Sequence, residues 1–222
     1  MLPKVTNFKL AIGFCCSWPF VPFPFFRSFV FLERPEFTPI FATNGPIDGL
    51  RNKVVEEAMS IGTSRLLMPD LDQTYPADTI TKLLSHNLPV VGAMVHRRYP
   101  PFDPLMLKGD INSYQLIEEW EDGELVEVDA TGSGCLMYDM RIFHELSPPW
   151  FKFRLNPDPE RPGIVGEDMG FCSDVRKARH KIYVDTSIKC GHLSTMEITQ
   201  ETHWLFKALK KKQAQADKEK SV

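Results

Sequence analysis

The segment LRNKVVEEAMSIGTSRLLMPDLD, residues 50–72, carries the pattern that decides the predicted fold. Its first part places apolar residues near one face of a helix and ends at Gly62, a typical C-cap residue. The short apolar run at 64–69 then predicts a buried strand. Asp70 and Asp72 follow that strand one residue apart. An open α/β sheet binds its ligands beyond the carboxyl ends of its strands, which is where this polar pair lies.

The alternation of strand and helix continues on both sides of this segment. Such alternation predicts a mostly parallel sheet with helices on its faces, an α/β fold. Strands are predicted at 7–15, 37–43, 64–69 and 88–95, and helices at 24–33, 50–62 and 76–87.

The second half of the chain mixes strands, short helices and proline-rich loops. Every break is short, so we expect one domain, residues 1–222, rather than two. Strands are predicted at 124–130, 134–140 and 181–187, helices at 141–147 and 167–180, irregular loops at 96–110 and 156–166, and a turn at 190–194.

The chain closes with an amphipathic helix that frays into a charged tail, residues 196–222. Trp204, Leu205 and Leu209 lie on one side of this helix, and three lysines follow them. We expect this face to dock on the domain or on a neighbouring subunit, which makes a homo-oligomer possible. The apolar face is short for binding to a membrane surface, which is the second interpretation.

Composition excludes several function classes. Net charge is −3 over 222 residues, so the chain as a whole has no positive electrostatic field that would attract nucleic acid. We therefore expect no stable nucleic-acid binding. The five cysteines are odd in number and contain no CxxC pair, which argues against a disulfide framework or a zinc ribbon. The simplest expectation is a cytoplasmic protein in a reducing compartment.

The aromatic stretch 18–31 is the most apolar part of the sequence. Three prolines and Arg27 interrupt it, so neither a transmembrane helix nor a signal peptide is expected. Its phenylalanines are expected mainly in the core, because Phe is usually buried. Contact with a sugar, a base, a membrane or a partner is the alternative.

The two carboxylates after the strand have a chemical interpretation. Residues i and i+2 of an extended segment point the same way, so Asp70 and Asp72 would face one space. Two such charges repel each other unless a cation neutralises them. Mg²⁺ or Mn²⁺ held by carboxylates and substrate phosphates fits this chemistry. A solvated turn is the alternative, because Asp is common in turns.

Several motifs in one order resemble a family of enzymes. The strand that runs into DLD, the segment VDATGSGCLMYDMRIFHEL, the segment VGEDMGFCSDVRKARHKIYVD and the late CGH together resemble the GT-A glycosyltransferases, in a family-2-like form, over residues 8–195. The resemblance implies a Rossmann-like GT-A domain with a nucleotide-sugar half at 1–95, an acceptor half at 96–195 and a C-terminal helix. It implies a metal-dependent hexosyltransferase that uses a UDP- or GDP-sugar.

By this resemblance, Asp72 and His192 would bind Mn²⁺ or Mg²⁺. Asp70 would contact the donor ribose or a metal-bound water, as an outer member of the metal set. Asp168 would be the base that deprotonates the acceptor hydroxyl, and Glu167 would bind a sugar hydroxyl. Retaining and inverting chemistry both stay open, and so does a structural role for His192 or for the two carboxylates that open the helix.

Donor contacts are expected from the segment that starts the long helix and from the loop after the strand 88–95. Arginine matches phosphate oxygens, although a solvated basic loop is an equal alternative for Arg97 and Arg98. Asp48 has the alternative of capping the helix. The candidate donor-binding residues are Asn44, Asp48, Arg51, Asn52 and Arg97.

Two competing functions remain beside the glycosyltransferase. A sugar-phosphate nucleotidyltransferase also pairs an α/β fold with acidic metal ligands, but it would need a Gly-rich basic loop after the first strand. The segment GFCCSWPFVP, residues 13–22, lacks both features. A non-catalytic nucleotide- or sugar-binding module of the same fold is the other alternative. The acceptor is open, from polysaccharide and lipid-linked sugar to protein, small molecule or modified nucleic acid.

Overall fold

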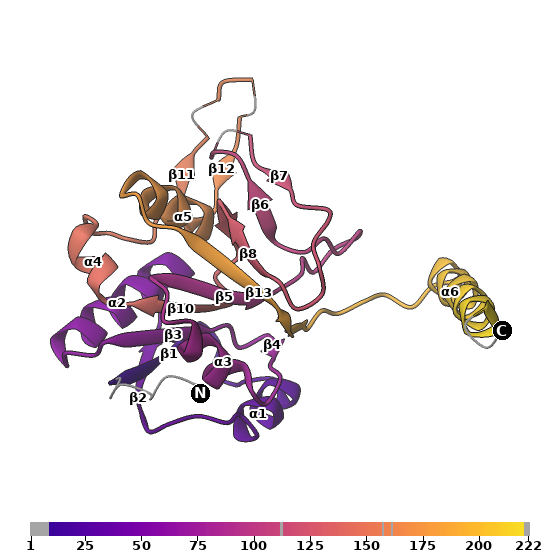
Figure 1. Ribbon diagram of the computed structural model, residues 1–222, viewed down its shortest axis with the longest axis horizontal. Coiled ribbons are helices and arrows are strands. Elements are labelled where there is room, and N and C mark those ends of the chain that lie inside the picture. Colours follow the sequence, from indigo (N-terminus) through magenta and orange to yellow (C-terminus); the bar gives the residue numbers. More distant parts are fainter. Residues whose placement is uncertain (1–8, 112, 157, 161, 220–222) are drawn as a thin grey trace.

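A seven-stranded sheet forms the centre of the molecule (Figure 1). The computed structural model describes residues 9–219 apart from 112, 157 and 161, so the first two residues of the strand expected at 7–15 lie outside the described part. Across the sheet the strands follow the order β2 (Phe37–Thr43), β1 (Leu10–Cys16), β3 (Arg65–Pro69), β10 (Cys135–Asp139), β5 (Val90–Met94), β13 (Ile182–Lys189) and β8 (Leu125–Val128).

Five of these strands run in one direction, which confirms the expected mostly parallel α/β sheet. β1 pairs in parallel with β2 and β3, and β5 pairs in parallel with β13. β10 lies antiparallel between β3 and β5, and β8 runs antiparallel to β13 at the edge. The carboxyl ends of the five parallel strands and the start of β10 therefore meet at one edge of the sheet.

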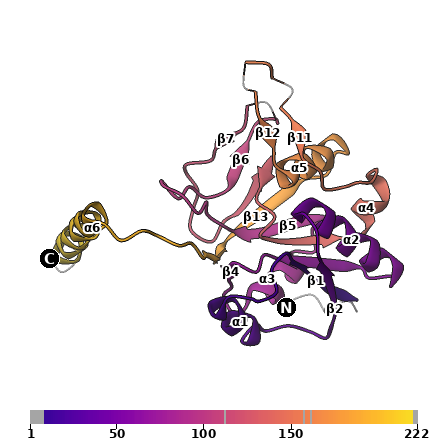
Figure 2. The ribbon, with the colours of Figure 1, turned by 180° about the vertical axis from the view of Figure 1, so that it is seen from behind.

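Helices cover both faces of the sheet (Figures 1 and 2). Successive side chains of β3 point to opposite faces: Leu66 and Met68 join one buried cluster, and Leu67 joins the other. The first cluster includes residues of α2, α4 and α5, and the second includes residues of α1 and α3. The helices are α1 (Phe23–Val30), α2 (Ile47–Ser60), α3 (Thr79–His86), α4 (Arg141–Glu145), α5 (Glu167–Lys177) and α6 (Gln200–Glu219).

Short strand pairs replace three segments expected to be irregular. The loop 96–110 contributes β6, the loop 156–166 contributes β12, and the expected turn 190–194 contains β14. Strands of two or three residues are too short to carry a detectable hydrophobic period. The short strands are β4 (Gln73–Thr74), β6 (Met106–Lys108), β7 (Gln115–Leu116), β9 (Ala130–Thr131), β11 (Arg154–Leu155), β12 (Ile164–Val165) and β14 (Gly191–His192).

The aromatic stretch 18–31 does not lie mainly in the core, so that expectation is wrong for most of its side chains. Phe25 is buried and Phe29 packs beside it, because one face of α1 covers the sheet. The opposite face of α1 and the loop before it are exposed. The exposed side chains are Trp18, Phe20, Val21, Phe23, Phe26, Val30 and Phe31.

α6 stands away from the sheet at the end of an extended linker (Figures 1 and 2). Its apolar side chains, which include Trp204 and Leu209, are exposed. Within the described residues, no helix has both the length and the apolar character needed to cross a membrane.

Gly134 allows a close approach between the start of β10 and the turn after β3. A Cβ on Gly134 would lie 1.9 Å from Nε2 of Gln73, a side chain that is itself buried. Gly134→Ala should therefore displace Gln73 and lower the free energy of unfolding by about 1–3 kcal/mol, measured by urea denaturation.

Gly163→Ala is the matched control, because a Cβ at Gly163 meets no atom within 4 Å. Its unfolding free energy should change by less than about 0.5 kcal/mol. Equal effects of the two substitutions would contradict the close approach at Gly134.

Candidate active site

Polar side chains gather where the parallel strands end. β3 ends before Asp70, β5 ends before the loop that holds Arg97, and β13 ends before His192. α5 begins at the same edge with Glu167. Ligands of open α/β sheets bind in this position, beyond the carboxyl ends of the strands.

Arg51 links three elements at the centre of this edge. Its Nη2 donates to Oδ1 of Asp70 at 2.9 Å, and its Nε donates to Oε1 of Glu167 at 3.2 Å. Its Nη1 donates to the carbonyl of Ser133 at 3.4 Å. The side chain is 4% exposed. Arg51 thus fastens α2 to the end of β3, to the start of α5 and to the turn before β10.

The neighbours of Arg51 stabilise its positive charge. Burial alone would lower its pKa, but Asp70, helped by other groups that include Glu167, raises the pKa above the ordinary value. Arg51 was predicted to contact the donor. All three nitrogens of its guanidinium have protein partners in this structure, and its contact with a donor stays a prediction.

The backbone around Asp70 is also fixed. The Asp70 amide donates to the carbonyl of Gly134 at 2.9 Å. The Tyr75 hydroxyl lies 2.6 Å from the carbonyl of Asp70 and 3.1 Å from that of Gly134. Tyr75 was not identified from the sequence, because its partners are backbone atoms far away along the chain. The Asp70 side chain keeps 28% exposure.

Asp72 and His192 come together through a short strand pair. β14 pairs antiparallel with β4, which sets His192 opposite Gln73. The Leu193 amide extends this ladder with a bond of 2.7 Å to the carbonyl of Asp72. Nε2 of His192 lies 3.6 Å from Oδ2 of Asp72. Two residues separated by most of the chain therefore share one space.

The imidazole of His192 is oriented by a backbone carbonyl. Its Nδ1 lies 2.6 Å from the carbonyl oxygen of His96, which fits an N–H donor at Nδ1 and leaves Nε2 directed toward Asp72. A backbone partner of this kind commonly fixes the tautomer of a metal-binding histidine. Burial would lower the pKa of His192, but Asp72 outweighs this and raises it.

Arg98 contacts the same carboxylate. Its Nη1 donates to Oδ2 of Asp72 at 2.9 Å, and its side chain is more than half exposed. Burial would raise the pKa of Asp72, but its contacts with His192 and Arg98 hold that pKa below the ordinary value. Asp72 is therefore a carboxylate at neutral pH, with one cation already beside it.

Asp72 and His192 offer two protein ligands, a carboxylate and an imidazole, which suit Mn²⁺ better than Mg²⁺. Within the described residues, no group of three or more His, Cys, Asp or Glu side chains could hold a metal ion. Arg51 engages Oδ1 of Asp70 in this structure, and Asp70 as an outer member of the metal set stays a prediction. A metal here would take its remaining ligands from the substrate or from water.

Glu167 and Asp168 lie at the start of α5 but differ in environment. Glu167 is buried and faces Arg51, which does not support its predicted contact with a sugar hydroxyl. Asp168 is half-buried, and its Oδ1 accepts the Met169 amide at 2.7 Å. Burial raises the pKa of Asp168 to about 6, and Glu167 adds to the shift. Asp168 can therefore exchange a proton near neutral pH.

Two of the other donor candidates lie at the start of α2. Asn52 is used in packing: its Nδ2 donates to the Phe151 carbonyl at 2.7 Å and its Oδ1 accepts the Phe151 amide at 3.0 Å. Both polar atoms of Asn52 thus have backbone partners, and its contact with a donor stays a prediction. Asp48 lies in the first turn of α2 without a side-chain capping bond at that helix end, and its Oδ1 is buried with no hydrogen-bond partner in the described part.

Asn44 follows the edge strand β2 with a left-handed backbone, φ 62°, and an exposed side chain. Its Nδ2 donates to Oγ1 of Thr43 at 3.3 Å. Asn44 therefore reaches the ligand edge of the sheet, two strands away from Asp70.

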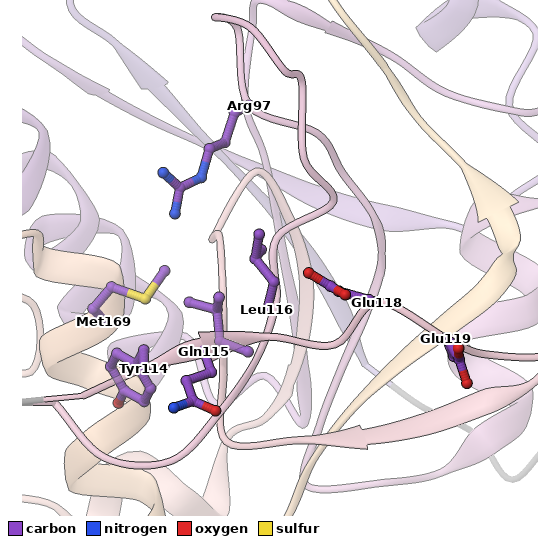
Figure 3. Close-up of a pocket in the computed structure, with 8 residues that line it drawn as sticks. Arg97, Tyr114, Gln115, Leu116, Glu118, Glu119 and Met169 are labelled. Carbon is purple, nitrogen blue, oxygen red and sulfur yellow. The ribbon is translucent and has the colours of Figure 1, made fainter.

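A pocket of about 960 Å³ opens next to the start of α5 (Figure 3). Arg97 reaches it from the loop after β5, and Figure 3 shows its guanidinium pointing toward Met169 and Tyr114. The Nε of Arg97 is buried without a hydrogen-bond partner among the described residues, and Nη1 donates to the Tyr99 hydroxyl at 3.1 Å. The other lining residues are Leu107, Gln115, Leu116, Glu118 and Glu119.

Comparison with known proteins shows the fold. The sequence matches no protein-family model and no curated protein. Among solved structures, A197 from STIV aligns with a TM-score of 0.57 and 14% identity over 84% of this chain and 86% of that one. GalNAc-T7, solved with UDP, GalNAc and Mn²⁺, aligns with a TM-score of 0.60 and 10% identity over 86% of this chain.

The alignment spans 44% of the GalNAc-T7 chain, less than half of its length. Identities this low carry information on the fold alone. The chain has a GT-A-like α/β fold, as its motif order predicted.

The contacts of Arg51 with Asp70, Glu167 and the Ser133 carbonyl, which we call the Arg51 clamp, give a stability prediction. Arg51→Met should lower the free energy of unfolding by about 3–5 kcal/mol, because it leaves two partly or fully buried carboxylates without their cation. Glu167→Gln combined with Arg51→Met should cost less than the sum of the two single changes, with a coupling of about 0.5–3 kcal/mol. Chemical denaturation of the four proteins measures both quantities.

Arg141→Met is the control, since Arg141 pairs with Asp139 while its side chain is 82% exposed. Its cost should stay near the range for surface ion pairs, about 1 kcal/mol or less. Additive costs of Arg51→Met and Glu167→Gln would contradict a clamp.

Proposed function

We propose that this protein is a metal-dependent glycosyltransferase that moves a sugar from a nucleotide diphosphate sugar to an acceptor hydroxyl. The observation that carries the proposal is the pair Asp72–His192, with Nε2 and Oδ2 3.6 Å apart at the ligand edge of the sheet. Its register is set by the β4–β14 pairing, and its imidazole is oriented by His96. The position of this pair supports the proposal, because ligands of open α/β sheets bind beyond the carboxyl ends of the strands.

Asp72 and His192 would hold Mn²⁺ or Mg²⁺ together with oxygens of the donor diphosphate. The bound ion would supply Lewis-acid stabilisation of the charge that develops on the departing diphosphate. Arg98 neutralises Asp72 in the structure described, and its long exposed side chain can turn onto a phosphate oxygen once another cation neutralises that carboxylate.

Asp70 would bind the donor ribose. Arg51 holds Oδ1 of Asp70, Gly134 and Tyr75 hold its backbone, and the carboxylate stays partly exposed. A carboxylate accepts hydrogen bonds from hydroxyl groups, and its rigid support reduces the entropy lost on binding. Asp48 and Asn44 remain candidates for contacts with the rest of the nucleoside.

Asp168 would accept the proton of the acceptor hydroxyl. A general base works best with a pKa near the working pH, and burial raises the pKa of Asp168 to about 6. The next residue, Met169, lines the 960 Å³ pocket, so an acceptor in that pocket would lie close to Asp168. Arg97 lines the same pocket and would offer its guanidinium to the same ligand.

Calorimetry with UDP and GDP tests the metal pair. Binding of one of the two diphosphates should require Mn²⁺ and should disappear on chelation. Asp72→Ala and His192→Ala should each remove the metal-dependent part of the binding, because each change removes one of the two protein ligands proposed for the ion.

Asp78→Ala is the matched control, an acidic residue paired with Lys82 on the exposed side of α3. It should bind as the wild type does. Metal-independent binding in the wild type, or unchanged binding in Asp72→Ala, would rule out the proposed metal site.

Asp168→Asn tests the base. The rate of UDP or GDP release from the nucleotide sugar should fall by about 10²–10⁴-fold, since general-base catalysis contributes that much. In the wild type the rate should rise with pH through about 6, because Asp168 must lose its proton to act.

Asp122→Asn is the control here: Asp122 is highly exposed and pairs with Lys189. It should keep both the rate and the pH profile. A wild-type rise through pH 6 that survives in Asp168→Asn would assign the titration to another group.

A further inference from the structure

The outward face of α1 carries apolar side chains where a helix at a protein surface usually carries polar ones. Phe23, Phe26 and Val30 follow the spacing i, i+3 and i+7, so they line one side of the helix. Trp18 and Phe20, in the loop before the helix, are each 70% exposed, and their rings lie 6.2 Å apart. With Val21 and Phe31 these residues form what we call the α1 face.

The α1 face has a charge pattern of its own. No Asp or Glu occurs between residues 17 and 32, and the sole charged residue there is Arg27, which is exposed. Trp and Phe beside a cation and without carboxylates suit the interface between lipid headgroups and acyl chains. The absence of carboxylates also removes the repulsion that an anionic membrane would otherwise exert.

α6 repeats this chemistry on a second element. Trp204, Leu205, Phe206 and Leu209 are between 50% and 60% exposed. Four lysines lie among and after them, and all four are exposed: Lys207, Lys210, Lys211 and Lys212. Apolar side chains beside clustered lysines are typical of helices that lie on anionic membranes.

The α1 face and the start of the linker to α6 lie in the same region of the molecule, next to β4. α1 packs near β4, and the rings of Phe25 and Tyr75 meet edge to face at 6.2 Å. β4 pairs with β14, and the linker to α6 starts at the next residue, Leu193. The seven residues 193–199 can extend about 23 Å, so α6 can reach a plane that also contacts the α1 face (Figures 1 and 2).

We propose that the α1 face and α6 together bind the surface of a bilayer that contains anionic lipids. The strength of membrane binding rises with the apolar area buried and with the attraction to anionic lipids, so two such elements bind more strongly than one. The α1 face would insert its aromatic rings, and the lysines of α6 would pair with lipid phosphates and carboxylates. The protein would thus be peripheral, with its candidate site held near the membrane. This inference does not depend on the proposed activity.

Cosedimentation of the full chain with vesicles tests the proposal. Vesicles of phosphatidylcholine mixed with phosphatidylserine should bind the protein, and vesicles of phosphatidylcholine alone should bind it at least about tenfold more weakly. Binding to the mixed vesicles should weaken with added salt, because the lysine contribution is screened.

Two variants separate the two elements. Phe23→Ser with Phe26→Ser should weaken vesicle binding about tenfold or more, through the loss of buried apolar surface. Lys211→Glu with Lys212→Glu should remove the preference for phosphatidylserine while binding to phosphatidylcholine stays. The four side chains are exposed, so circular dichroism and the melting temperature should not change.

Leu155→Ser with Ile164→Ser is the matched control. These two side chains are 82% and 72% exposed on the β11–β12 pair, away from α1 (Figure 1). The control should bind vesicles as the wild type does. Three results would overturn the proposal: no vesicle binding, equal binding by the Phe23→Ser/Phe26→Ser variant, or a dimer in light scattering that those substitutions dissociate while vesicles bind nothing.

Discussion

The candidate site depends on one buried cation. Arg51 projects from α2 into the space between the end of β3 and the start of α5, and it bonds to a side chain or a carbonyl on each side. Removing a guanidinium from water is costly unless its N–H groups find hydrogen-bond partners. The partners of Arg51 are distributed over three elements. The position of Asp70 is therefore coupled to that of α5. Asp168, at the start of that helix, acquires its setting from the same interaction.

The order of strands and helices was predictable because long elements have a clear hydrophobic period. β2 agrees with its expected range, and β3, β5, β10 and β13 lie within two residues of theirs. The convergence of Asp72 and His192 was also predictable, through the motif order rather than the spacing. The short β4–β14 pair that produces this convergence could not be predicted, because two residues have no period and their partners lie more than a hundred positions away.

The environment of several side chains could not be predicted from their chemistry. Arg51 and Asn52 were donor candidates from the segment they lie in, yet Arg51 bonds to two carboxylates and a carbonyl, and Asn52 bonds to backbone atoms. Conversely, the phenylalanines of 18–31 were expected inside, and α1 has only one inward face to offer them. Polarity alone does not tell whether a side chain faces a ligand, a buried partner or solvent. That distinction depends on tertiary contacts.

His192 lies where a force on α6 would enter the domain. It is the last residue of β14, and the chain leaves the domain immediately after it. A load applied through α6 meets the bond from Oγ of Ser194 to the Arg98 carbonyl, and next the bond from the Leu193 amide to the Asp72 carbonyl. A slip of this short ladder by one residue would turn the imidazole to the opposite face of the strand. A pull on the last helix thus reaches His192 before it reaches any strand of the central sheet.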